Sequence, residues 1–166
     1  MIVAAVLMLA CIGATHAGDQ AGLAPQAAQA LAHPGAVVLY SLEPTVDSPP
    51  RSRSLHGFDV LGHASLSKAE GNDAIAAFRS AMNNPITVPD NGKAEVVVAA
   101  CFEPRHAITI QFGRHRFDYL LCFGCGQMEV FRDGRMISDV PAGGSPDALN
   151  GLLKAKGLPL SKTSTL

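Results

Sequence analysis

The chain has 166 residues, a formal net charge of -1 and a sequence pI of about 6.6. That length is typical of one domain with a core of its own. There is no excess of basic residues, so neither nucleic acid nor an anionic membrane surface is predicted as a partner. Tryptophan is absent and aromatic residues make up 5%, so we expect a mostly aliphatic core. No phosphate-binding glycine loop occurs, and no nucleotide cofactor is predicted.

The first 17 residues, MIVAAVLMLACIGATHA, have the pattern of a secretory signal peptide. Their apolar run, residues 2–12, is shorter than the roughly 20 residues that a membrane-spanning helix needs. Small residues near the end of the segment suit cleavage after Ala17. The protein is therefore predicted to be exported, either to a periplasm or to the outside of the cell.

A lipoprotein signal is the alternative at the N-terminus. Leu9-Ala10-Cys11 resembles the end of such a signal, in which the cysteine is lipidated, although Met8 stands where leucine is usual. On this alternative the signal ends before Cys11 and a lipid anchors the protein. In both cases, contact with a membrane is expected only through the signal peptide or the lipid.

Residues 18–34 are rich in alanine and glutamine, and we expect a flexible leader there, or at most one weak helix. A single domain is predicted over residues 35–160, followed by a polar tail over residues 161–166. Runs rich in β-branched or alternating apolar residues predict its strands. In chain order these cover residues 35–42, 60–66, 95–101, 108–112, 116–123, 127–131 and 135–137. The run VVVAA at residues 96–100 is apolar on both faces, which is typical of a central strand.

Two helices are predicted in this domain. The first follows Ser67 as its N-cap, and Glu70 three residues later completes a capping-box pattern. The second begins at Ser145-Pro146-Asp147 and has an apolar face of leucines. The order of these elements predicts an α+β fold, in which an antiparallel β-sheet carries two helices packed on it.

Three cysteines and one histidine lie around the predicted hairpin of residues 108–123. If three residues form its loop, His106 lies opposite Cys122, and a two-residue loop shifts this pairing by about one position. Cys125 follows across a tight C-F-G-C-G turn, and Cys101 is five residues before His106. We therefore expect Cys101, His106, Cys122 and Cys125 to meet at one end of the sheet.

A set of three cysteines and one histidine favours tetrahedral Zn²⁺ or another soft metal, because thiolate and imidazole are its preferred ligands. A C-x-x-C-G motif between two strands also resembles the knuckle of zinc ribbons and rubredoxin-like sites. There, backbone amides point at the thiolates and the glycine permits a left-handed turn. The leading hypothesis is an exported protein with a structural zinc site and no catalytic residue, rather than an enzyme.

Two other functions stay open. Cys122 and Cys125 could instead form a disulfide in a purely structural envelope protein. Alternatively, the C-x-x-C motif could serve a thiol–disulfide or thiol-nucleophile enzyme that also uses Cys101 or His106. Three cysteines remain after the signal is lost, and an odd number leaves one unpaired in any scheme of disulfides alone. That oddness favours a metal site.

Arg105 is a candidate for contact with an anionic ligand, because it adjoins His106 in the predicted site. The simpler interpretation is a surface arginine paired with Glu103 or Asp118. No serine-centred elbow or paired-carboxylate motif points to a further catalytic site.

Four segments carry a resemblance to a known group of proteins. They are LYSLEP at residues 39–44, HGFDVLG at 56–62, CFEPRH at 101–106 and CFGC at 122–125. The pattern resembles an uncharacterised family of small exported bacterial proteins with a C-x-x-P-R-H … C-F-x-C signature. The likeness covers about residues 35–133. It implies an exported setting and a link between the two cysteine motifs, but no particular activity.

Overall fold

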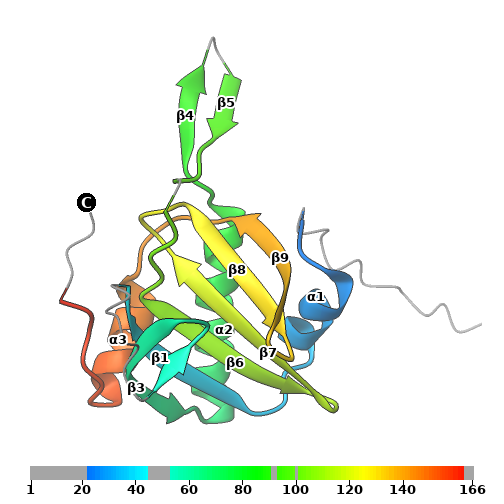
Figure 1. Ribbon diagram of the computed structural model, residues 1–166, viewed down its shortest axis with the longest axis vertical. Coiled ribbons are helices and arrows are strands. Elements are labelled where there is room, and N and C mark those ends of the chain that lie inside the picture. The colour runs from blue at the N-terminus through cyan, green and yellow to red at the C-terminus, as the bar shows by residue number, and fades with distance from the viewer. Residues whose placement is uncertain (1–21, 45–52, 91–92, 100, 163–166) are drawn as a thin grey trace, which may run out of the picture.

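The computed structural model describes residues 22–44, 53–90, 93–99 and 101–162 (Figure 1). The elements in chain order are α1 (Pro25–Ala32), β1 (Val37–Glu43), β2 (Ser54–Leu55), β3 (Phe58–Ser65), α2 (Lys68–Asn83), β4 (Thr87–Asp90), β5 (Lys93–Val96), β6 (His106–Phe112), β7 (His115–Cys122), β8 (Gln127–Arg132), β9 (Arg135–Pro141) and α3 (Asp147–Ala155). Seven strands form one curled antiparallel sheet, a half-barrel, in the order β2-β3-β1-β6-β7-β8-β9. β4 and β5 pair in a separate two-stranded sheet.

The fold is mostly β, so the prediction of an α+β fold with two packed helices is wrong. The described residues contain three short helices, and sheet exceeds helix. Two segments contribute to the difference between the predicted and the observed fold. The alanine-rich segment before the first strand is partly helical, and the apolar run expected as a central strand lies in and beside the small second sheet.

Helix α1 occupies part of the segment in which a flexible leader, or at most one weak helix, was expected. Pro25 lies in its first turn, where the missing N–H removes no intrahelical hydrogen bond. Ala27, Ala30 and Leu31 are buried in the main core. The small side chains of Ala27 and Ala30 allow the helix to approach the sheet closely. The Tyr119 hydroxyl donates a hydrogen bond to the Ala27 carbonyl oxygen at 2.7 Å, which ties α1 to β7.

We expect Tyr119→Phe to lower the free energy of unfolding by about 1 kcal/mol, because the Ala27 carbonyl oxygen loses its hydrogen-bond donor. Amide hydrogen exchange within α1 should become faster than in wild type, since the helix loses a link to the sheet. Urea unfolding measures the first effect, and exchange followed by mass spectrometry measures the second. Unchanged exchange in α1 would show that Tyr119 does not fasten this helix.

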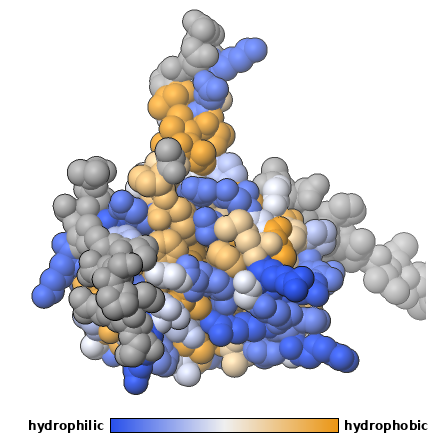
Figure 2. Space-filling view, in the orientation of Figure 1, coloured by the Kyte–Doolittle hydropathy of each residue, from blue (hydrophilic) through white to orange (hydrophobic). Residues whose placement is uncertain are grey.

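The hairpin of β4 and β5 projects from the body of the protein (Figure 1). Asp90 pairs with Lys93, and the intervening sequence is Asn-Gly, which favours tight hairpins. Val88, Val96 and Val98 are 43%, 46% and 49% exposed, and Figure 2 shows an orange hydrophobic patch on the hairpin. The prediction of a central strand at residues 96–100 is therefore wrong. Local pairing across the Asn-Gly sequence has taken precedence over insertion into the main sheet.

Helix α2 begins as the sequence predicted. Ser67 Oγ accepts from the Glu70 amide at 3.4 Å, and the Ser67 amide donates to the Glu70 carboxylate at 2.8 Å, which confirms the capping box. Lys156 Nζ lies 2.7 Å from Glu70 Oε1 and joins α3 to α2. The hydrogen bonds from Lys156 and then Ser67 lower the pKa of Glu70 to about 2.

The main sheet buries side chains on both of its faces. The larger cluster lies between the sheet and the three helices and includes Ile108, Tyr119 and Leu121. The smaller cluster on the opposite face consists of Leu42, Leu55, Ala107, Leu120 and Phe131. Polar groups on β6 and β7 therefore need partners within the protein. Among the described helices, none has the length and hydropathy to cross a membrane.

Candidate functional site

The turn between β7 and β8 holds two of the predicted site residues in direct contact. Cys122 and Cys125 form a disulfide across it. The Cys125 amide donates to Cys122 Sγ at 3.0 Å, and Gly126 has a left-handed backbone with φ of 72°. These are the two features expected of a C-x-x-C-G knuckle. Cys122 and Cys125 are 1% and 5% exposed, so solvent has little access to either sulfur.

Cys101 lies in a segment that is attached to Cys125 on both sides. The Ala99 amide donates to the Cys125 carbonyl oxygen at 2.7 Å. The Glu103 amide donates to Cys125 Sγ at 3.2 Å. Cys101 itself is exposed and is not in a disulfide. The backbone on both sides of Cys101 is therefore tied to Cys125.

His106 is not the cross-strand partner of Cys122. Phe112 pairs with His115, so the loop between β6 and β7 has two residues, and His106 pairs with Leu121 instead of Cys122. Because side chains alternate along a strand, His106 and Leu121 face the helices, whereas the alternation directs Cys122 to the opposite face. The four predicted zinc ligands are therefore not all brought together.

In the parts of the chain that the structure describes, no three or more His, Cys, Asp or Glu side chains are grouped so that they could hold a metal. Cys122 and Cys125 are joined to each other, which occupies both sulfurs. Zinc binding by the reduced protein stays a prediction. Cys11, the predicted lipidation site, lies outside the described residues.

His106 forms one wall of a cavity at the end of the sheet nearest α3. The cavity has a volume of about 280 Å³. It is lined by Ser41, Glu103, Arg105, His106, Leu121, Phe123, Pro146, Asn150, Leu153, Leu160, Ser161 and Lys162. The His106 Nε2 atom lies 2.9 Å from Asn150 Oδ1, and its ring meets Phe123 edge to face at 5.7 Å. Burial and then the nearby Arg105 charge lower the pKa of His106, against the Asn150 hydrogen bond that raises it.

Arg105 lines this cavity, as expected for a contact with an anionic ligand, but it also has partners in the protein. Its Nη2 atom is 3.8 Å from Glu103 Oε2, and its Nη1 atom donates to the Glu103 carbonyl oxygen at 3.4 Å. Of the two sequence-based interpretations, the pairing with Glu103 is therefore present, and a ligand contact stays a prediction.

Sequence reasoning missed two polar residues of the cavity, Ser41 and Asn150. Ser41 sits in the middle of β1 and is fully buried. A serine at an inward position of an apolar strand was a signal, but a weak one. Asn150 reaches His106 from α3, which is 44 residues away along the chain. No local pattern predicts such a contact.

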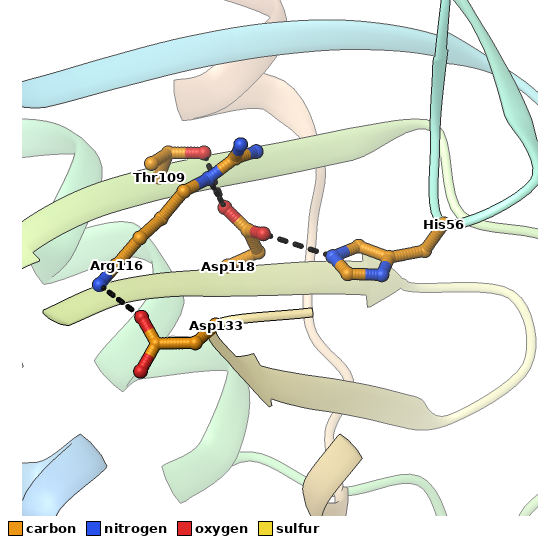
Figure 3. A network of polar contacts seen from close by, with 5 residues as sticks. All are labelled: His56, Thr109, Arg116, Asp118 and Asp133. Atoms are coloured by element: carbon orange, nitrogen blue, oxygen red, sulfur yellow. Dashed lines mark hydrogen bonds and ion pairs between the residues drawn. The ribbon is translucent and has the colours of Figure 1, made fainter. Parts of the chain in front are cut away.

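A second polar network, also missed, lies on the opposite face of the sheet and is centred on Asp118 (Figure 3). Asp118 Oδ1 accepts from Thr109 Oγ1 at 2.6 Å and from Arg116 Nε at 2.8 Å. His56 Nε2 lies 2.9 Å from Asp118 Oδ2. Burial alone would raise the pKa of Asp118, but the hydrogen bonds from His56, Thr109 and Arg116 outweigh it and hold the pKa below its usual value.

This network fixes the segment before β3 onto the sheet. His56 has a left-handed backbone, with φ of 52°, and its ring stacks on Phe131 with a centroid separation of 3.6 Å. Together with Asp118, these contacts anchor a turn that covers the smaller cluster. We interpret the network as structural, because its carboxylate is enclosed by partners.

Comparison of the chain with protein families, curated proteins and solved structures gives no match. Function is therefore inferred from the site alone.

Proposed function

We propose that this protein exchanges disulfides with the thiols of client molecules, with Cys101 as the exposed thiol and Cys122–Cys125 as the buried disulfide. The observation that carries the proposal is the attachment of Cys125 to the chain on both sides of Cys101, through Ala99 and Glu103. Two residues span at most about 7 Å, so Cys101 is confined to the neighbourhood of the Cys125 sulfur. Clients reach Cys101 from solvent, but not the buried pair.

The exchange begins when Cys101 loses its proton to solvent and its thiolate attacks Cys125 Sγ. A Cys101–Cys125 bond forms, the Cys122–Cys125 bond breaks, and Cys122 leaves as a thiolate. A client thiolate then attacks Cys101 Sγ and displaces the Cys125 thiolate. This leaves a mixed disulfide between the client and Cys101. A second thiolate of the client attacks the client sulfur of this disulfide, forms a disulfide within the client and displaces the Cys101 thiolate. The client dithiol has lost two electrons, and the protein holds three thiols. An external disulfide reverses these steps and restores the protein.

Backbone amides stabilise both leaving groups in this sequence. Cys122 Sγ accepts from the Cys125 amide, and Cys125 Sγ accepts from the Glu103 amide. A hydrogen bond to the charged form of a sulfur favours the thiolate. The donors belong to the main chain of a tight turn and of a fixed segment, so they are in place before the sulfur becomes charged. The predicted export of the protein suits this chemistry, because disulfides persist in oxidising compartments.

A soft-metal site in the reduced protein is the second candidate function. The knuckle geometry favours it, since amides point at both sulfurs and Gly126 has the left-handed turn. Reduced Cys101, Cys122 and Cys125 offer three thiolates, and water or an outside ligand supplies the fourth position on zinc. His106 is left out of this set, because it pairs with Leu121 and faces away from Cys122.

Counting alkylated thiols, with zinc analysis, tests both functions on the mature protein. For exchange, we expect one reactive thiol in the oxidised protein and three after mild reduction, with reversible conversion in a thiol–disulfide buffer. For metal binding, zinc added to the reduced protein should protect three thiols at one metal per chain. A disulfide that is reduced only when the protein unfolds would contradict the exchange function. Three fully reactive thiols in the presence of zinc would contradict the metal site.

A further inference from the structure

The outer edge of β5 has no strand beside it. In the described part of the chain, β4 and β5 form a sheet of two strands that stands away from the main sheet (Figure 1). A two-stranded hairpin is at best marginally stable alone, and a third strand or packing against a helix is needed to stabilise it. The exposed apolar residues of this region are Ile86, Val88, Val96, Val97 and Val98. The hairpin therefore has the open edge and the apolar surface of an incomplete sheet.

The register of the hairpin shows which backbone groups lie on that edge. The Val97 amide donates to the Ile86 carbonyl oxygen at 2.9 Å, so these two residues form a hydrogen-bonded pair. Hydrogen-bonded and non-hydrogen-bonded pairs alternate along antiparallel strands. Val96, and Ala94 opposite Pro89, are therefore in non-hydrogen-bonded pairs, and their N–H and C=O groups point away from β4.

The two edges of the hairpin differ in their capacity to pair with another strand. Pro89 has no N–H, so the outer edge of β4 lacks a donor at this position, which discourages the addition of a strand. The outer edge of β5 contains no proline and presents the donors and acceptors of Ala94 and Val96. A further strand is therefore accepted by β5 in preference to β4.

The charges on β5 identify the strand that fits this edge. Lys93 and Glu95 are exposed, and because they flank Ala94 their side chains lie on the same face of the hairpin. If a second β5 pairs antiparallel with Ala94 opposite Ala94, the outward groups of the two alanines form a hydrogen-bonded pair. In this register each Lys93 lies opposite the Glu95 of the other copy. Opposite charges in such cross-strand pairs stabilise a sheet.

Other registers of the same two strands are less favourable. A shift of one residue sets the outward groups of one strand against residues whose groups already bond to β4, so hydrogen bonds are lost. A shift of two residues, in either direction, places two copies of Lys93 or two copies of Glu95 opposite each other, and like charges there are destabilising. The sequence of β5 is therefore complementary to itself in one register.

We propose that two copies of this protein associate through β5, in a continuous sheet with the strand order β4-β5-β5-β4 and a two-fold axis at Ala94. Val96 then lies diagonally across from the second copy's Ala94, which covers part of the exposed apolar surface. Pro89 lies near both outer edges of the new sheet, so the assembly closes at two copies. This association goes beyond thiol exchange and uses no cysteine.

The test measures the mass of the mature protein by analytical ultracentrifugation over a range of concentrations. All measurements are made with Cys101→Ser, so that a disulfide between copies is not mistaken for pairing of β5. We expect a dimer that dissociates on dilution. Ala94→Pro removes an outward N–H of β5 and should raise the dimer dissociation constant at least about tenfold. The matched control is Thr87→Pro, which removes the outward N–H of β4 opposite Val96 and should leave the dissociation constant unchanged.

Charge reversal tests the register. Lys93→Glu and Glu95→Lys each put like charges in both cross-strand pairs, so each variant alone should have a dissociation constant at least about tenfold higher. An equimolar mixture of the two variants should regain the original affinity, because every glutamate then faces a lysine. A parent protein that is still monomeric at about 100 µM would overturn the proposal. Unchanged association of Ala94→Pro or of either charge variant, or a mixture that stays monomeric, would also overturn it.

Discussion

Cys101→Ser should slow the reduction of the folded protein by a small dithiol by about a hundredfold or more. In the wild type, the neighbouring Cys101 thiolate opens the disulfide from within, and such an intramolecular attack has a large advantage over attack from solution. In the variant, the dithiol must reach Cys122 or Cys125 directly, and these are 1% and 5% exposed. The rate of thiol release at neutral pH measures the effect.

Two further measurements test whether the slower reduction is due to the loss of the Cys101 thiol. Cys101 is exposed and makes no disulfide, so Cys101→Ser should leave the melting temperature of the oxidised protein almost unchanged. Cys122→Ser removes the buried partner instead, and on oxidation it should form a Cys101–Cys125 disulfide that peptide mapping identifies. Equal rates of reduction in wild type and Cys101→Ser, or no such disulfide in Cys122→Ser, would contradict the role given to Cys101.

The parts of the fold that sequence predicted correctly are those that local chemistry determines. The capping box of Ser67 and Glu70 needs only residues within one turn, and the structure has both of its hydrogen bonds. The hairpin of β6 and β7 follows from alternation on either side of a Gly-containing turn. The C-x-x-C-G turn likewise carries its own signal, and Cys122 and Cys125 meet as expected.

The predicted meeting of His106 with the cysteines was wrong because it depended on the length of the loop between β6 and β7. A three-residue loop would place His106 opposite Cys122, but the loop has two residues. A shift of one position moves a side chain to the other face of a sheet. His106 therefore joins Ser41 and Asn150 in a cavity beneath α3, instead of joining the sulfurs. The alternation of apolar residues and the strand propensity of each residue do not distinguish two hairpin loops that differ in length by one residue.

Two other segments depend on packing between distant parts of the chain, which local sequence patterns do not contain. The alanine-rich helix α1 has no strong helix signals, and it is held by burial and by Tyr119, which is 92 residues away from Ala27. The valines around β5 would suit a buried strand equally well, yet the structure exposes them. In both segments, the sequence pattern fits two environments, and contacts elsewhere in the chain decide between them.

Asp118→Asn should lower the free energy of unfolding by about 3 kcal/mol at pH 7. The carboxylate accepts from Thr109, Arg116 and His56 in a buried position, and an amide cannot accept from all three. Breaking a buried charged network leaves its remaining members without a partner, which costs more than the loss of an exposed ion pair. The turn at His56 should also lose order, which would increase its hydrogen exchange. Urea unfolding measures the change in stability.

The pH dependence of the same variant identifies the carboxylate as the cause. The folded-state pKa of Asp118 is below its usual value, so its contribution is complete above the unfolded pKa of about 3.9 and is lost as pH falls through the folded pKa. The stability difference between wild type and Asp118→Asn should therefore be constant near neutral pH and shrink below about pH 4. The matched control is Asp133→Asn, at an exposed carboxylate that accepts from the Arg116 amide. Asparagine tolerates the left-handed backbone of Asp133, so this control should cost much less at pH 7. Equal losses in the two variants would show that burial of the Asp118 network adds nothing to the stability of the fold.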